Sequence, residues 1–246
     1  MRKVRDVGSW VIIFKKEYPV RKGWYMRIVI IRHGDPDYEK DCLTKKGHEQ
    51  AALAAKRLLI EDIDEVCSSP LGRAVETAEA FTELTGKGPL KILDFMQEIR
   101  YGREDDLYSE AGHPWNNADR MIFEGINVND PEWRNFPAFI DNTATIDVDK
   151  VMKGTDEWLK TLGYEREGLY YRNKRSDDKQ YTVALFCHGG SATAMLSRIY
   201  NQQFPYMCSV VHMAHTGITV LRFDCNPGSL TVPVLELLND DRHLRR

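Results

Sequence analysis

The stretch Arg27-Ile28-Val29-Ile30-Ile31-Arg32-His33-Gly34 is the best starting point for interpreting this sequence. Residues 28–31 form an unbroken run of β-branched apolar side chains, which is typical of a strand buried on both faces of a parallel sheet. The run ends in Arg32, His33 and Gly34, which are poor core residues but useful ones for chemistry. Because ligands of open α/β sheets bind beyond the carboxyl ends of the strands, we expect a functional site directly after this strand.

The composition indicates one large folded domain, or one domain with an insert. The chain has 246 residues, of which 42% are hydrophobic and 29% are charged, and its net charge is −3. This charge gives no general attraction to nucleic acid or to an anionic membrane, so we expect neither as a partner. Five single cysteines without a C-x-x-C pair indicate reduced thiols in a cytoplasmic protein. The oligomeric state cannot be inferred from the sequence.

Residues 1–25 do not resemble the rest of the domain. We expect them to form an N-terminal extension that is disordered or that results from a misassigned start, because Met26 stands directly before the organising strand and is a natural first residue. The alternative is an ordinary extra strand or arm. The domain itself is then expected to cover residues 26–246.

The rest of the chain alternates between strand and helix patterns. Further strands are predicted at 65–68, 91–93, 181–187, 217–223 and 231–238, and helices at 45–60, 71–84, 146–162 and 191–200. Thr44 is the predicted N-cap of the first helix, and Ser69 that of the second, with Pro70 at its first position. This order predicts a three-layer α/β/α fold with a mostly parallel sheet, one antiparallel edge strand and a cap insert.

The cap insert is expected between about residues 100 and 146, where the periodicity is lost. A segment of this length without regular structure is usually a lid or a binding insert. Five of its residues stand where they could touch a substrate, although packing within the cap or solvent exposure is the simpler interpretation for each. They are Tyr101, Arg103, His113, Trp115 and Arg120.

Basic side chains follow three of the predicted strands. His33 and His188 each end a strand and each precede a glycine, and the turn after the strand at 65–68 places Arg73 in the first turn of a helix. Because the carboxyl ends of parallel strands meet at one edge, these groups and Arg32 should converge there. Guanidinium groups and helix N-termini bind phosphate oxygens well. The sequence therefore predicts a pocket for a dianion.

The same segments resemble the histidine phosphatase superfamily, which includes cofactor-dependent phosphoglycerate mutases and many small phosphatases. The matching motifs are R-H-G at 32–34, S-P-L-G-R-A at 69–74 and H-G-G at 188–190. The L-T-K-K-G-H-E-Q-A run at 43–51 is similar to the family's L-T-x-x-G-x-x-Q-A run. The order matches across residues 26–238 apart from the insert. Closer still, the chain resembles a bacterial branch that begins R-H-G-(D/E)-P-D-Y.

The resemblance implies a role for each group in the pocket. His33 attacks phosphorus and becomes phosphohistidine, while Arg32, Arg73, His188 and Gly189 hold the phosphoryl oxygens. Such catalysis depends on positioning and on electrostatic stabilisation. The resemblance implies no metal ion and no other cofactor.

The general acid is expected beyond the third strand. The segment Q-E-I-R-Y-G at 97–102 resembles the N-E-R-H-Y-G segment of the mutases, which assigns Glu98 as the acid for the leaving group and then as the base for water. Asp105 and Asp106 are weaker alternatives. His212 is expected to be a structural residue or to lie at the rim of the site.

The expected function is hydrolysis of a small phosphorylated metabolite by a metal-independent phosphomonoesterase. One alternative is a phosphoglycerate mutase, although residues 103–108 are acidic and lack the lysine and the E-R-R run of the mutases. A second is a haloacid-dehalogenase-type phosphatase that uses Asp35, Asp37 and magnesium. A third is a non-catalytic member that only binds phosphorylated ligands.

Overall fold

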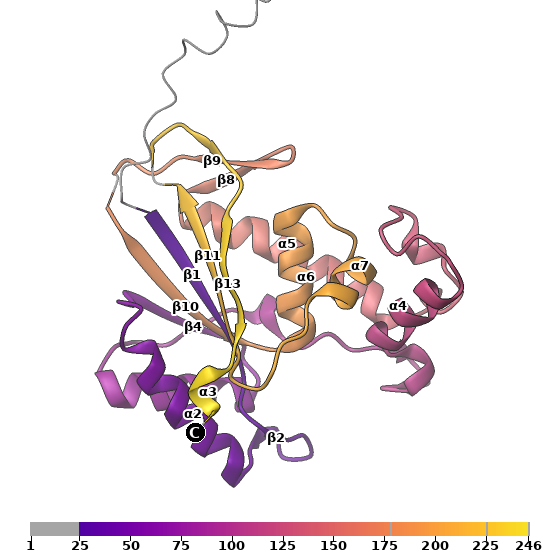
Figure 1. The fold of residues 1–246 in the computed structure, drawn as a ribbon, viewed down its shortest axis with the longest axis horizontal. Helices are drawn as coiled ribbons and strands as arrows, with labels where there is room; N and C mark the ends of the chain where they lie inside the picture. The colour runs from indigo at the N-terminus through magenta and orange to yellow at the C-terminus, as the bar shows by residue number, and fades with distance from the viewer. Residues whose placement is uncertain (1–24, 178, 225, 246) are drawn as a thin grey trace, which may run out of the picture.

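The computed structural model describes residues 25–177, 179–224 and 226–245, and a six-stranded sheet forms the centre of the molecule (Figure 1). The strands lie in the order β13-β11-β1-β10-β4-β5. Their bounds are Tyr25–Arg32 for β1, Glu65–Ser68 for β4, Lys91–Ile92 for β5, Tyr181–Cys187 for β10, Ile218–Asp224 for β11 and Val234–Asp240 for β13.

The sheet is mostly parallel, as predicted. β1 pairs in parallel with β10, β10 with β4, and β4 with β5. β11 runs antiparallel to both of its neighbours, β1 and β13. The one reversed strand is therefore β11, the second strand from the edge, and not the edge strand as expected. The reason is that β13 turns back beside β11 and so recovers the direction of β1.

Helices cover both faces of the sheet (Figure 1). α2 (Lys45–Leu58) and α3 (Gly72–Thr85) pack on the face to which Val29 and Ile31 point. α5 (Thr143–Thr161) and α6 (Gly189–Tyr200) pack on the opposite face, against Met26, Ile28 and Ile30. Because successive side chains of a strand point to opposite faces, a strand covered on both sides needs an unbroken apolar run. This arrangement confirms the predicted three-layer α/β/α class.

Three predicted helix starts differ from the observed ones, those of α3, α5 and α6, of which α6 begins at Gly189 and not at Ser191. Thr44 caps α2 as expected, since its hydroxyl accepts a hydrogen bond from the Gly47 backbone nitrogen. The prediction that Ser69 caps the next helix is wrong: α3 begins at Gly72 after Leu71, and the Ser69 hydroxyl lies 2.7 Å from His188 Nε2 instead. α5 begins at Thr143, a few residues before the expected start, because the Asn142 side chain accepts a hydrogen bond from the Ala144 nitrogen.

The insert contains more regular structure than its sequence pattern indicates. It forms the hairpin of β6 (Gly102–Arg103) and β7 (Asp106–Leu107), the helix α4 (Pro114–Phe123) and two short 3-10 turns, η3 (Glu110–Gly112) and η4 (Trp133–Asn135). α4 packs against α7 (Phe204–Val210), beyond the end of α6 (Figure 1). Trp133 and Phe139 are fully buried and meet edge to face, and both belong to the hydrophobic core that lies between the sheet and α5 and α6.

Smaller elements complete the fold. They are the hairpin of β2 (Pro36–Asp37) and β3 (Cys42–Leu43), the small sheet of β8 (Tyr164–Glu167), β9 (Tyr170–Asn173) and β12 (Leu230–Thr231), and the 3-10 turns η2 (Asp94–Met96) and η5 (Arg242–Leu244).

The predicted N-terminal extension lies outside the described residues except for Tyr25, which pairs with Asp224 at the start of β1. The boundaries of the extension and of the domain therefore stay predictions. Within the described part of the chain, no helix has both the length and the apolar character needed to span a bilayer.

Candidate active site

Two neighbouring parallel strands bring the two histidines together. Arg32 of β1 is in register with Cys187 of β10, and the next residue of each strand is a histidine. The His33 backbone nitrogen donates to the Cys187 carbonyl oxygen at 2.9 Å, and the rings of His33 and His188 have centroids 5.1 Å apart. Both side chains are buried. The predicted convergence of these imidazoles is therefore present in the structure.

The start of α2 holds the loop that follows His33. The Asp35 carbonyl oxygen accepts a hydrogen bond from the Thr44 nitrogen at 3.0 Å, and the Asp35 nitrogen donates to Gln50 Oε1 at 2.8 Å. A Cβ atom on Gly34 would lie 2.6 Å from the Gly47 carbonyl oxygen, so the loop and the helix approach closely only because glycine occupies both positions. The L-T-x-x-G-x-x-Q-A pattern thus fixes the backbone beside His33.

The hydrogen bond of His33 determines which ring nitrogen is free to react. Its Nδ1 atom lies 2.7 Å from the Gly34 carbonyl oxygen, which can only accept, so Nδ1 carries the proton and Nε2 keeps its lone pair. Burial lowers the pKa of His33 to about 3; the bond to Gly34 opposes this change, and the charges of Arg32 and Arg73 add to it. The imidazole is therefore neutral and nucleophilic at neutral pH.

Two guanidinium groups stand beside the histidine pair. Arg32 donates to the Met213 carbonyl oxygen at 2.6 Å, and Arg73 pairs with the Asp41 carboxylate. The Nε atoms of both arginines are buried without a hydrogen-bond partner among the described residues. Each guanidinium is thus fixed by one contact and keeps donors for an anion.

His188 is held by Ser69, at the end of β4. His188 Nε2 lies 2.7 Å from the Ser69 hydroxyl, while His188 Nδ1 is buried without a partner within the described part of the chain. Burial lowers the pKa of His188 well below its ordinary value, and the neighbouring His33, Arg73 and Arg32 add to this shift. His188 is therefore a neutral hydrogen-bonding group at neutral pH.

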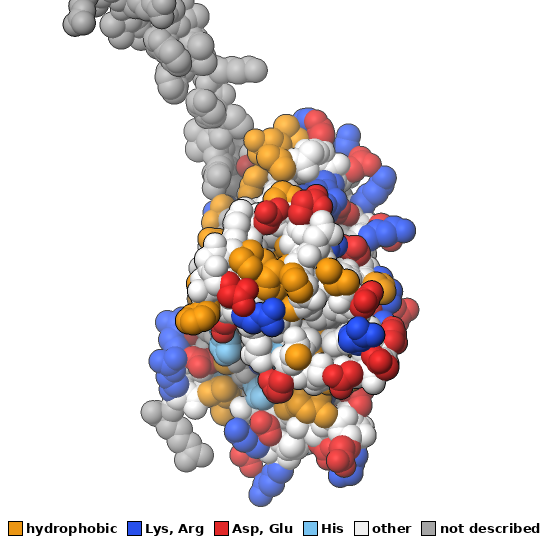
Figure 2. All heavy atoms as spheres, turned by 90° about the vertical axis from the view of Figure 1, so that its right-hand side faces the viewer, with side chains coloured by type: hydrophobic (Ala, Val, Ile, Leu, Met, Phe, Trp, Pro, Cys, Tyr) orange, Lys and Arg blue, Asp and Glu red, His pale blue; other side chains and the backbone are white. Residues whose placement is uncertain are grey.

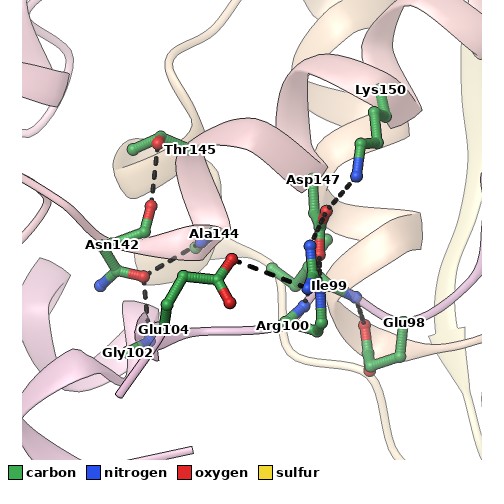
Figure 3. A network of polar contacts seen from close by, with 10 residues as sticks. All are labelled: Glu98, Ile99, Arg100, Gly102, Glu104, Asn142, Ala144, Thr145, Asp147 and Lys150. Atoms are coloured by element: carbon green, nitrogen blue, oxygen red, sulfur yellow. Dashed lines mark hydrogen bonds and ion pairs between the residues drawn. The ribbon is translucent and has the colours of Figure 1, made fainter. Parts of the chain in front are cut away.

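Glu98 lies at the N-terminus of α6, next to the histidine pair. Its Oε1 atom accepts hydrogen bonds from the backbone nitrogens of Ile99 at 2.9 Å and Ser191 at 3.1 Å, of which Figure 3 shows the first. Its Oε2 atom accepts a hydrogen bond from the Gly190 backbone nitrogen at 3.3 Å. Burial raises the pKa of Glu98, although these backbone donors and the charge of Arg32 oppose the change. A carboxyl group with a raised pKa is suited to give and take a proton.

Comparison with known proteins identifies the family. A family model described as histidine phosphatase superfamily (branch 1) matches residues 28–140. A probable phosphatase of Schizosaccharomyces pombe is 35% identical over an alignment of 177 residues that covers 67% of this chain and 69% of that protein. The chain belongs to the histidine phosphatase superfamily. The predicted superfamily and enzyme class are thereby confirmed.

Solved structures of other phosphatases have the same fold. The phosphoserine phosphatase of Entamoeba histolytica in complex with 3-phosphoglyceric acid has a TM-score of 0.58 at 20% identity and covers 89% of this chain and 99% of its own. A mycobacterial glucosyl-3-phosphoglycerate phosphatase has a TM-score of 0.59 at 21% identity, with 87% and 99% covered. At these identities the likeness concerns the fold alone.

His215, which was not predicted from the sequence, lies against the histidine pair. The ring of His215 lies 5.6 Å from that of His33, and its Nδ1 atom lies 3.7 Å from Asp35 Oδ1. Burial lowers the pKa of His215 to about 4, and Arg32 adds to the shift. The position of His215 could have been anticipated only from the antiparallel pairing of β11 with β1. Because Ile218 lies opposite Ile31, the loop before β11 must lie beside the end of β1. His212, which was expected to be structural or to lie at the rim of the site, is exposed and lines the cavity.

A cavity of about 1190 Å³ extends from Arg32 and Arg73 to the cap. Of the five cap residues singled out in the sequence, Tyr101, His113 and Trp115 line this cavity, whereas Arg103 and Arg120 do not. The alternative acids Asp105 and Asp106 are exposed and lie outside the lining. On the side of the molecule that carries α4, hydrophobic and acidic side chains are interspersed with histidine (Figure 2).

The described residues contain no group of three or more histidine, cysteine, aspartate or glutamate side chains placed to bind one metal ion. The carboxylates of Asp35 and Asp37 have separate partners. Asp35 Oδ2 accepts a hydrogen bond from the Thr44 hydroxyl at 2.7 Å, and Asp37 Oδ2 accepts one from Lys40 Nζ at 3.0 Å. These contacts do not fit the paired carboxylates of the magnesium-dependent alternative.

Proposed function

We propose that this protein hydrolyses phosphomonoesters of small metabolites through a phosphohistidine at His33. The observation that carries the proposal is the position of the His33 ring, 5.1 Å from the His188 ring, with the Arg32 and Arg73 charges close enough to lower the pKa values of both. A neutral nucleophile beside two fixed cations is what attack on a phosphate dianion requires.

In the first step, His33 Nε2 attacks phosphorus and the ester oxygen leaves. Arg32 and Arg73 neutralise the charge that spreads over the phosphoryl oxygens, and His188 and the backbone nitrogen of Gly189 add hydrogen bonds. The Gly34 carbonyl oxygen stabilises the positive charge that forms on the imidazole when the new bond is made, because it accepts from Nδ1 at 2.7 Å.

Glu98 supplies the proton in the first step and removes one in the second. Its protonated form gives a proton to the departing alkoxide, which leaves the enzyme as an alcohol. The resulting carboxylate then takes a proton from water as the water oxygen attacks phosphohistidine, releasing inorganic phosphate and restoring both His33 and Glu98. The raised pKa of Glu98 increases the protonated fraction that the first step needs.

Two finer assignments accompany this proposal. The R-H-G-D-P-D-Y opening at 32–38 supports a place in the bacterial branch with that start. A reducing, cytoplasmic location is supported by the free thiols of Cys42, Cys67, Cys187 and Cys208.

The test is direct detection of the intermediate. The wild-type protein, mixed with ³²P-labelled substrate and quenched in alkali, should carry label that is lost in acid, and His33→Ala should carry none and lose nearly all turnover. Arg73→Ala should lower turnover by about 10²–10³-fold. His48→Ala, which removes an exposed histidine, is the matched control. Substantial turnover by His33→Ala would refute the proposal.

The same assay separates the alternatives. A magnesium-dependent phosphatase would lose activity in excess EDTA, whereas the histidine mechanism keeps it. A mutase would pass the label from 2,3-bisphosphoglycerate to 3-phosphoglycerate in preference to water. A non-catalytic member would bind orthovanadate without releasing phosphate from any ester.

A further inference from the structure

Aromatic side chains of the cap form a row along the cavity outside the phosphoryl pocket. The ring of Tyr101 meets those of Tyr108 and His113 edge to face, with centroids 5.2 Å and 4.8 Å away. The His113 ring lies 5.6 Å from that of Trp115, which also packs against Phe204. The first four of these residues line the cavity. Such a row offers flat apolar contact area to a ring on the substrate.

The two cations in this outer part of the cavity are already paired with one carboxylate. Asp147 Oδ1 accepts hydrogen bonds from Lys150 Nζ at 2.9 Å and from Arg100 at 3.1 Å, and Asp147 Oδ2 accepts from Arg100 Nε at 2.9 Å. Figure 3 shows both side chains directed at Asp147, with Glu104 also paired to Arg100. A second anionic group on a substrate would have to compete with these contacts.

Two further carboxylates face the cavity without a compensating cation. Asp94 and Asp119 line it, are exposed, and have no ion-pair partner among the described residues. Outside the phosphoryl pocket, the lining thus carries three carboxylates and only the two paired cations. Carboxylates that line a cavity disfavour an anionic ligand, and solvent screening reduces this effect at exposed positions such as Asp94 and Asp119.

We propose that the substrate is a phosphomonoester of an uncharged alcohol that carries an aromatic ring, and that esters with a carboxylate or a second phosphate are disfavoured. This inference rests on the proposed phosphatase function and specifies its substrate class. The phosphoryl group binds between Arg32 and Arg73, and the ring contacts the Tyr101–Trp115 row. The cavity volume, about 1190 Å³, has room for an alcohol the size of a nucleoside.

The ring is tested with two esters that both release a primary 5′-alkoxide of ribose. Adenosine 5′-monophosphate and ribose 5-phosphate differ by the presence of the base, and we expect kcat/KM to be at least about tenfold higher for the nucleotide, because stacking on aromatic side chains contributes about that much. Trp115→Leu should reduce this ratio. Since Trp115 also packs against Phe204, Tyr108→Leu, at an exposed position, serves as a second variant with the same expected effect. Equal values for the two esters would overturn the assignment of a ring.

The charge is tested with glycerol 3-phosphate and 3-phosphoglycerate, which differ by a carboxylate. We expect 3-phosphoglycerate to be at least about tenfold poorer in kcat/KM, and the double variant Asp94→Asn/Asp119→Asn to narrow this difference by about threefold or more. The control is Asp105→Asn/Asp106→Asn, which makes the same change in net charge at exposed positions outside the cavity. It should leave the difference in kcat/KM between the two esters unchanged. A preference for 3-phosphoglycerate would overturn the exclusion of a second anion.

Hydrolysis of p-nitrophenyl phosphate separates this inference from the function on which it rests. The wild-type protein could hydrolyse that ester through His33 and yet prefer neither adenosine 5′-monophosphate over ribose 5-phosphate nor glycerol 3-phosphate over 3-phosphoglycerate. In that case only the substrate class is wrong. If the wild-type protein neither hydrolyses that ester nor forms phosphohistidine, the proposed function itself fails.

Discussion

Glu98 and Gly190 lie so close together that no side chain fits at position 190. The Glu98 Oε2 atom accepts a hydrogen bond from the Gly190 backbone nitrogen at 3.3 Å, and a Cβ atom on Gly190 would lie 2.5 Å from Glu98 Oε1 and 2.5 Å from Ile99 Cγ1. A Cβ atom on Gly189 would lie no nearer than 3.8 Å to the Arg32 side chain, which is an ordinary contact distance. The H-G-G motif therefore needs its second glycine to admit Glu98.

Gly190→Ala should consequently displace Glu98 and Ile99. We expect the free energy of unfolding to fall by about 1–3 kcal/mol, as is usual for an atom forced into a packed site, and activity on alkyl phosphates to fall with it. Gly189→Ala is the steric control and should unfold at the same denaturant concentration as the wild type. Equal stability of the two variants in urea titrations would show that Glu98 does not require this glycine.

Asp41 is expected to act through Arg73. Its Oδ2 atom accepts a hydrogen bond from the Gly72 nitrogen at 2.7 Å, and its Oδ1 atom pairs with the guanidinium. Asp41→Asn should weaken this hold and lower kcat/KM by about tenfold, which is the effect of losing one charge-assisted hydrogen bond. The Ki of orthovanadate should rise in parallel, because the anion contacts would be disturbed. Asp37→Asn, which removes only an ion pair with the exposed Lys40, is the control. An equal fall in kcat/KM for both substitutions would contradict a positioning role of Asp41.

The fold and the site follow from the sequence where local pattern and tertiary packing agree. The strands β4 and β10 match their predicted bounds. β10 is a run of apolar and β-branched residues that the fold buries on both faces, and the shorter β4 contributes the buried pair Val66 and Cys67. The proximity of His33 and His188 was predicted because two neighbouring parallel strands end at the same edge of the sheet. Arg73 needed only the position of a helix start.

The residues that were missed depend on pairings between distant segments. Ser69 had the local pattern of an N-cap, but His188 lies across the strand end and takes up its hydroxyl. His215 has no local motif, and only the antiparallel register of β11 places it beside His33. The helix α4 was missed because Ala118 is the one apolar residue at its centre, between two polar pairs, and because its packing partner α7 is distant in the sequence.

The buried histidines predict how stability depends on pH. The pKa of His33 is lowered to about 3 and that of His215 to about 4, against an ordinary value of 6.5. At a pH between the lowered pKa values and 6.5, these histidines are protonated in the unfolded chain but neutral in the folded protein. The free energy of unfolding should therefore fall as the pH falls from 6.5 towards 4. Urea titrations at several pH values measure this slope. His215→Asn should make it shallower, whereas His48→Asn, at an exposed position, should not. An unchanged slope in His215→Asn would contradict the assignment.

The role of Glu98 as an acid predicts a dependence on the leaving group. An alkoxide is a strong base and needs a proton as it leaves, whereas p-nitrophenolate leaves almost unaided. Glu98→Gln should therefore lower kcat for an alkyl phosphate far more than for p-nitrophenyl phosphate. Glutamine keeps the volume of the side chain, and its one carbonyl oxygen can still accept the hydrogen bonds from Ile99 and Ser191, so a general loss of structure is not expected. The 3.3 Å bond from Gly190 is lost, because the amide nitrogen cannot accept it.

The pH profile provides a second readout for the same residue. Burial raises the pKa of Glu98, and the acid must be protonated, so kcat for the alkyl ester should fall as the pH rises through that pKa. In Glu98→Gln this fall in kcat at alkaline pH, the alkaline limb of the profile, should disappear because the amide does not titrate. If Glu98→Gln slowed both esters equally and kept the limb, another group would have to donate the proton.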